Sequence, residues 1–222
     1  MDNFHSSPRN GLRRARVRPV FGLIISLTAA LAPAYQAAAG DRYVYIVNTR
    51  THMLAEVFAH HVEVGARVVL WPHYGGESQQ FKVEELPVSP NHPYDRPWFL
   101  LRARHSNKCL RAGEQSGAPV VQAVCTGEAK QMWRVRIVEM TPAECGTPNQ
   151  CFGGRRSLLE NAFDYERRCL DAANGRFPAP PEKGAGLQVF ECIPKFSAPN
   201  AVNQEWELVN IQDWGAPGPV VR

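Results

Sequence analysis

The sequence lacks the short motifs that mark the common catalytic and metal-binding classes. It contains no Gly-x-Ser-x-Gly, His-Glu-x-x-His or P-loop pattern. It also contains no Cys-x-x-Cys pair, and no histidine stands at ligand spacing from a cysteine. These absences argue against a hydrolase, a zinc protein and a nucleotide-binding protein. We therefore expect no catalysis, no metal and no cofactor.

A strong charge of one sign is also missing from most of the chain. The formal net charge of the 222 residues is +4. Residues 1–39 hold five of the 25 basic residues and one of the 21 acidic residues, which leaves 20 of each sign in the remainder. Binding driven by the release of counterions from nucleic acid needs a basic surface, so we expect no nucleic-acid partner.

Residues 1–39 have the pattern of a secretory signal peptide. An arginine-rich start precedes an apolar run over residues 20–34, and Ala37, Ala38 and Ala39 follow. The alternative is an uncleaved membrane anchor, which Pro33 and the weakly apolar end of the run disfavour. We expect a mature domain over residues 40–222 that is secreted, extracellular or periplasmic, without stable membrane insertion after cleavage.

Six cysteines lie in the predicted mature part, and export would place them in an oxidising compartment. An even number there indicates three disulfides, but six cysteines allow 15 pairings. The cysteines are Cys109, Cys125, Cys145, Cys151, Cys169 and Cys192. The positions of the cysteines within the sequence are needed to select among these pairings.

The mature part contains one pattern three times, over about residues 43–86, 98–139 and 156–210, with a short tail at 211–222. Each copy has an apolar strand, a polar turn, a leucine, a second apolar strand and a Gln-x-aromatic triplet. The leucines are Leu54, Leu110 and Leu170; the triplets run from Gln79, Gln131 and Gln204 to Phe81, Trp133 and Trp206. No copy could bury its apolar face alone, so the pattern predicts an all-β domain with one shared core. We expect the three aromatic residues in that core and the three glutamines bonded to backbone.

The repeats also select a disulfide pairing. The residue before each leucine and the end of the second strand occupy equivalent positions, which hold Met53/His73, Cys109/Cys125 and Cys169/Cys192. Two repeats thus carry a cysteine pair and the first has lost both members. We predict disulfides Cys109–Cys125 and Cys169–Cys192, which leaves Cys145–Cys151 to close a small loop.

The three copies resemble the ricin-type lectins, whose repeats carry Cys-Leu-Asp early and Gln-x-Trp late. The resemblance covers about Tyr43 to Asn210 and implies a β-trefoil that binds galactose-like or related glycans. It also implies a sugar site made from an Asp after Cys-Leu, a Gln two residues before an aromatic, and an Asn before Gln-x-Trp. The third repeat has the full set: Asp171, Gln188, Phe190, Asn203 and Gln204. Phe190 stands where the family usually has tryptophan, so the stacking surface would be smaller.

The other two repeats depart from that set. By the same alignment, the second has Arg111, Gln122, Val124 and Lys130, and the first has Ala55, Val69, Trp71 and Ser78. Neither offers a carboxylate beside a ring, so we expect glycan binding mainly in the third repeat.

A second interpretation is the cell-binding subunit of a multi-component toxin. Cytolethal distending toxins are similar in having secreted ricin-like subunits that dock a catalytic chain, although the lipidated N-terminal cysteine of one such subunit is absent here. In the lectin interpretation, Asp171→Ala should abolish glycan binding and leave the thermal midpoint nearly unchanged.

Overall fold

The fold is a β-trefoil built from twelve strands of one sheet, four from each repeat. The computed structural model describes residues 42–87, 97–139, 155–163, 168–175, 179–192 and 203–215. The predicted signal peptide and the predicted Cys145–Cys151 bridge lie outside them. Among the residues described, no helix is long and apolar enough to cross a membrane.

The strands follow the apolar segments of the sequence. The first repeat forms β1 (Tyr43–Asn48), β2 (Leu54–Val57), β3 (Val68–Trp71) and β4 (Phe81–Glu85). The second forms β5 (Phe99–Ala103), β6 (Cys109–Arg111), β7 (Val121–Ala123) and β8 (Met132–Glu139). The third forms β9 (Arg155–Asn161), β10 (Arg168–Ala172), β11 (Leu187–Glu191) and β12 (Trp206–Asn210). Short 3₁₀ turns at Glu77–Gln79 and Ala129–Gln131 lead into β4 and β8.

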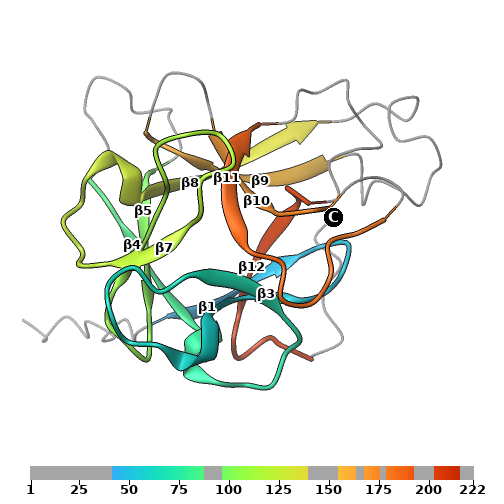
Figure 1. The fold of residues 1–222 in the computed structure, drawn as a ribbon, viewed down its shortest axis with the longest axis horizontal. Coiled ribbons are helices and arrows are strands. Elements are labelled where there is room, and N and C mark those ends of the chain that lie inside the picture. The colour runs from blue at the N-terminus through green and yellow to red at the C-terminus, as the bar shows by residue number, and fades with distance from the viewer. Residues whose placement is uncertain are drawn as a thin grey trace, which may run out of the picture. The chain divides into compact units, whose positions relative to one another are not determined.

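The last strand of each repeat pairs with the first strand of the next. β4 pairs antiparallel with β5, β8 with β9, and β12 returns to β1, as the blue and red strands of Figure 1 show. This cyclic pairing leaves three hairpins, β2–β3, β6–β7 and β10–β11.

The loop of each hairpin contacts the next hairpin, and these contacts fix which residues are equivalent. The backbone N–H of Gly65 donates to Gln122, that of Gly117 to Val189, and that of Gly184 to Leu70, at 2.8–2.9 Å. The three glycines have φ values of 80–90°, which glycine adopts without strain. Leu70, Gln122 and Val189 therefore occupy one position of the pseudo-threefold pattern.

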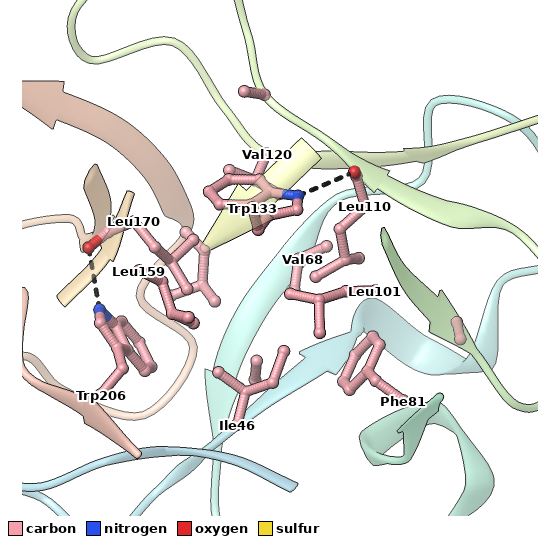
Figure 2. Packing of buried hydrophobic residues seen from close by; sticks show 14 of the residues in the cluster. Ile46, Val68, Phe81, Leu101, Leu110, Val120, Trp133, Leu159, Leu170 and Trp206 are labelled. Atoms are coloured by element: carbon pink, nitrogen blue, oxygen red, sulfur yellow. Dashed lines mark hydrogen bonds between the residues drawn. The ribbon is translucent and has the colours of Figure 1, made fainter. Parts of the chain in front are cut away.

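The three aromatic residues of the Gln-x-aromatic triplets lie in the shared core, which confirms the prediction (Figure 2). Phe81, Trp133 and Trp206 are each no more than 1% exposed. Both indoles satisfy their buried N–H groups: Trp133 donates to the Leu110 carbonyl at 3.2 Å and Trp206 to the Leu170 carbonyl at 2.8 Å. Phe81 has no such group and needs no partner.

Two of the predicted disulfides, Cys109–Cys125 and Cys169–Cys192, are present. In the first repeat, Leu54 lies opposite Trp71 as Cys169 lies opposite Phe190. The equivalent of the first cysteine is therefore Leu54, and the assignment to Met53 was wrong by one residue.

Aromatic and apolar contacts replace the disulfide in the first repeat. Leu54 packs in a small cluster with Tyr45, against which Trp214 of the C-terminal segment also packs. His73, at the position of the second cysteine, stacks on the Trp214 ring with centroids 4.8 Å apart. This end of the domain is thus closed by a residue that lies beyond β12.

Candidate functional site

Three of the five residues predicted for the third repeat lie on one face of the β10–β11 hairpin, and the other two, Asn203 and Gln204, precede β12. Asp171 pairs with Gln188 across the two strands, and Cys169 pairs with Phe190. Because side chains alternate along a strand, Leu170 and Val189 point into the core, whereas Asp171, Gln188 and Phe190 share the opposite face. The hairpin register therefore brings the carboxylate, the amide and the ring together.

Three side-chain amides converge on the Asp171 carboxylate. Gln188 donates to Oδ1 at 2.8 Å, whereas Asn203 and Gln204 donate to Oδ2 at 2.6 and 3.0 Å. Gln204 is fully buried and also donates to the Glu191 carbonyl at 3.0 Å, which confirms its predicted backbone bond. Gln204 therefore orients the carboxylate from behind and is not placed to touch a ligand.

Burial dominates the electrostatics of this carboxylate. Asp171 is only 2% exposed. Burial raises its pKa to about 6, because desolvation outweighs the hydrogen bonds from Gln188 and Gln204. Phe190, in contrast, is 44% exposed. The hairpin thus presents an open ring beside a carboxylate that amides hold in place.

The site retains hydrogen-bond acceptors that the protein does not use. A carboxylate offers about four acceptor positions, and the three amides occupy three of them. The Asn203 Oδ1 atom is buried and has no hydrogen-bond partner. Gly175 lies directly against Asn203, since a Cβ atom added there would stand 2.6 Å from the Asn203 Cβ. The unpaired amide oxygen is therefore fixed next to the carboxylate.

The first repeat contains a carboxylate that the sequence alignment missed. Glu56 lies opposite Val69, as Asp171 lies opposite Gln188, so Glu56 and not Ala55 is the equivalent residue. Gln79 donates to Glu56 Oε2 at 3.0 Å and to the Pro72 carbonyl at 2.9 Å, which repeats the two bonds of Gln204. Glu56 is 4% exposed, and burial raises its pKa above the usual value.

Polar and aromatic groups surround Glu56. The Tyr74 hydroxyl lies 2.7 Å from Ser78 Oγ and 3.2 Å from His60 Nε2. Trp71 occupies the position of Phe190, but the Lys183 ammonium from the third repeat lies 4.3 Å from its ring centroid. The first repeat thus has a carboxylate and a ring, with a cation over the ring.

The second repeat differs from the alignment in two places. Gln122 is equivalent to Val189 and not to Gln188; it is fully buried and donates to the carbonyls of His61 and Glu63 at 2.8 Å. Gln122 therefore anchors the loop between β2 and β3. The ring position holds Ala123, which lies opposite Cys109, and not Val124.

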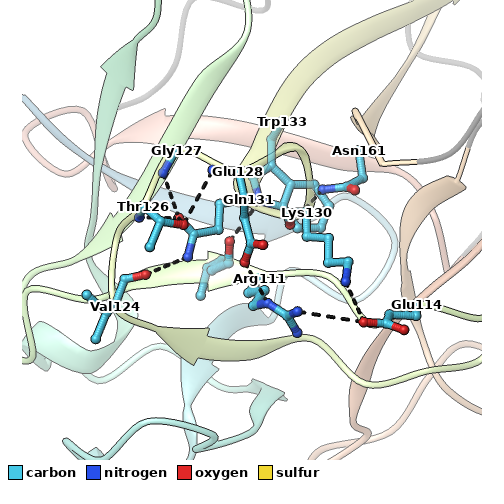
Figure 3. A network of polar contacts seen from close by, with 11 residues as sticks. Arg111, Glu114, Val124, Thr126, Gly127, Glu128, Lys130, Gln131, Trp133 and Asn161 are labelled. Atoms are coloured by element: carbon cyan, nitrogen blue, oxygen red, sulfur yellow. Dashed lines mark hydrogen bonds and ion pairs between the residues drawn. The ribbon is translucent and has the colours of Figure 1, made fainter.

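The predicted cation at the carboxylate position of the second repeat is present. Arg111 lies opposite Val121 as Asp171 lies opposite Gln188, so Arg111 and Asp171 occupy equivalent positions. Gln131 donates to the Val124 carbonyl at 2.6 Å, which confirms the last of the three predicted backbone bonds. Figure 3 shows Arg111 beside Lys130, with Glu114 and Glu128 around them.

Comparisons with known proteins establish the fold and nothing finer. No family model and no curated protein matches the sequence. A designed threefold-symmetric protein, ThreeFoil, is similar in structure, with a TM-score of 0.54 and 22% identity over 76% of this chain and 99% of that one. The Rhizoctonia solani agglutinin is also similar in structure, with a TM-score of 0.51 and 11% identity over 77% of this chain and 95% of that one. A chain of the cytolethal distending toxin from Actinobacillus actinomycetemcomitans has a TM-score of 0.51 and 13% identity, over 76% of this chain and 91% of that one.

Proposed function

We propose that this protein is a non-catalytic lectin that binds galactose-like or related glycans through its third repeat. The observation that carries the proposal is the convergence of Gln188, Asn203 and Gln204 on Asp171, beside the exposed ring of Phe190. Saccharide sites combine an apolar platform with a few fixed polar groups, and the hairpin face provides both. Two disulfides suit secretion or the periplasm, which we include in the proposal.

The geometry indicates how two neighbouring hydroxyls would be held. Asp171 is 2% exposed and the Asn203 Oδ1 atom is buried, so a ligand reaches these acceptors only after local movement of the side chains around them. One hydroxyl then donates to the remaining acceptor position of Asp171, and the adjacent one donates to Asn203 Oδ1. The C–H face of the sugar stacks on Phe190. Gln188 and Gln204 keep the carboxylate in place, so the carboxylate itself needs no reordering when the ligand arrives.

A single shallow site of this kind gives weak affinity, of the order of millimolar or about −4 kcal/mol. The first repeat supplies a second candidate site, because Glu56 and Gln79 reproduce the bonds of Asp171 and Gln204 beside Trp71. Two weak sites on one chain would bind a multivalent glycan surface more tightly than either alone.

A glycan array on the oxidised protein tests the proposal. We expect the natural protein to give signals with galactose-class glycans. The Asp171→Asn variant should lose the signals that depend on the third repeat. Asp213→Asn, the same change at an exposed residue after β12, is the matched control and should keep every signal. Unchanged binding by Asp171→Asn would reject the third-repeat site.

The second candidate function is that of a cell-binding subunit in a toxin of the cytolethal distending type. The likeness in fold to a chain of such a toxin supports it. The partner would then be a separate catalytic chain. Co-expression with the products of neighbouring genes tests this function: a stable complex with a nuclease-like chain favours the toxin subunit, and a protein that purifies alone favours the free lectin.

A further inference from the structure

The second repeat has the scaffold of the proposed sugar site with the opposite charge. Its hairpin has the same register, its tryptophan bonds to the same carbonyl position, and Gln131 makes the same backbone bond as Gln204. At the two polar positions, however, Arg111 replaces Asp171 and Lys130 replaces Asn203. The scaffold therefore presents two cations where the third repeat presents a carboxylate and an amide.

These cations already hold a carboxylate, which is that of Glu114 (Figure 3). Lys130 Nζ is hydrogen-bonded to Glu114 Oε1, and Arg111 Nη2 lies 3.9 Å from the same oxygen. Arg111 Nε donates to the Glu128 carboxylate at 2.8 Å. The arrangement of Arg111 and Lys130 is thus one that accommodates an anionic group.

The cations are fixed, whereas the carboxylate they hold is exposed. The side chains of Lys130 and Arg111 are 16% and 29% exposed, against 65% for Glu114. The Lys130 ammonium also lies 4.7 Å from the Phe163 ring centroid. An exposed ion pair is weak and is screened by salt, so the Glu114 side chain can be exchanged for a dissolved anion.

The backbone at Glu114 does not need to move in this exchange. Buried Arg168 donates through Nη1 to the Glu114 carbonyl, which fixes the loop between β6 and β7. Only the Glu114 side chain has to turn toward solvent. When it does, Arg111 and Lys130 face one remaining carboxylate, that of Glu128, and the site carries one net positive charge.

We propose that Arg111 and Lys130 form a subsite for the carboxylate or sulfate group of an acidic saccharide, which replaces the Glu114 carboxylate. A neutral sugar does not fit this subsite, because Ala123 stands at the ring position and provides no stacking surface. The charged group must supply the binding energy. The saccharide part of this inference rests on the proposed lectin function, since it follows from the equivalence of the three repeats.

The test is an NMR titration of the oxidised ¹⁵N-labelled protein with glucuronate, inorganic sulfate and neutral galactose. We expect glucuronate and sulfate to shift the amide signals of Arg111 and Lys130. Glu114→Gln should tighten glucuronate binding about two- to fivefold, the factor by which an exposed ion pair competes. Arg111→Ala should weaken it about tenfold, as expected for a lost bond between charged groups.

Glu77→Gln is the matched control, because Glu77 is also an exposed carboxylate paired with an arginine, Arg104. It should leave glucuronate binding unchanged. Absence of shifts at Arg111 and Lys130 in both the natural protein and Glu114→Gln would overturn the subsite, and shifts with sulfate alone would overturn its assignment to a saccharide. Galactose shifts around Asp171 report separately on the proposed lectin site, so either proposal can fail without the other.

Discussion

The buried carboxylate of Asp171 should make glycan binding depend on pH between about 5 and 7. Its pKa is about 6, and only the ionised form can accept bonds from three amides and a sugar hydroxyl together. About nine-tenths of the carboxylate is ionised at pH 7 and about one-tenth at pH 5. We therefore expect the apparent affinity for a galactose-class ligand to fall about tenfold as the pH is lowered from 7 to 5.

The same pKa acts on stability in the opposite direction. The ordinary pKa of the side chain is 3.8, so between about pH 4 and 6 the folded protein binds a proton at Asp171 that the unfolded chain does not. The free energy of unfolding therefore decreases as pH rises through this window, by about 3 kcal/mol for a shift of this size. Acid thus stabilises the fold at Asp171 while it weakens binding.

Calorimetric titrations at pH 5, 6 and 7, with denaturant unfolding at pH 4 and 7, would measure both effects. Comparison with Asp171→Asn isolates the contribution of this one carboxyl group, since the variant has no proton to bind there. A natural protein whose affinity is constant from pH 5 to 7 would refute the role given to Asp171. An unfolding free energy whose pH dependence equals that of Asp171→Asn would refute the raised pKa.

Three further predictions follow from the site and its supports. Asp171→Ala should leave the thermal midpoint at pH 7 nearly unchanged, because the loss of the acceptor for three amides, which costs about 1–3 kcal/mol, is offset by the removal of a buried charge. At pH 4 the carboxyl group is neutral in the folded protein, so only the loss of the acceptor remains and the midpoint should fall. Gln122→Ala should lower the free energy of unfolding by about 2–4 kcal/mol in urea, whereas exposed Gln115→Ala should not. Glu56→Gln should halve the calorimetric stoichiometry for a monovalent sugar, and an unchanged stoichiometry would exclude the first-repeat site.

The fold could be predicted because its signals are local and occur three times. Each Gln-x-aromatic triplet places a large ring in the core and a buried amide against a hairpin carbonyl, as at Trp133 and Gln131. The cysteine pairs at equivalent positions of two repeats predicted the two disulfides that the described residues contain. None of these features depends on the exact pairing of two strands.

The first-repeat carboxylate could not be found in the same way, because it depends on strand register. Leu54 looks like the anchor Leu170, but the pairing of Leu54 with Trp71 makes it the equivalent of Cys169. A shift of one residue moves every side chain to the other face of a strand. Ala55 was therefore read at the position that Glu56 occupies. The spacing from Trp71 to His73 equals that from Phe190 to Cys192, but it aligns only the second hairpin strand and does not fix the register of Glu56.

A similar shift concealed the structural role of Gln122. The sequence alignment matched Gln122 and Val124 to Gln188 and Phe190, which placed Gln122 on the proposed ligand face, although counting four residues back from Cys125 reaches Val121. Its true position is that of Val189, on the core face, where an amide has to find partners. It finds them in the carbonyls of His61 and Glu63, which belong to the neighbouring repeat. Contacts between repeats are not visible in the sequence of a single repeat.

The buried glutamines explain how one fold can carry three differently charged positions. Gln79, Gln131 and Gln204 each donate to the carbonyl of the residue directly after the ring position, whichever residue occupies the carboxylate position. Where that residue is Glu56 or Asp171, the amide also donates to the carboxylate. Where it is Arg111, the amide of Gln131 keeps its bonds to the backbone without a carboxylate partner, and the fold persists. Because the scaffold bond does not depend on this residue, its charge can change from repeat to repeat without loss of the trefoil, and each ligand site can therefore be tested, and lost, separately.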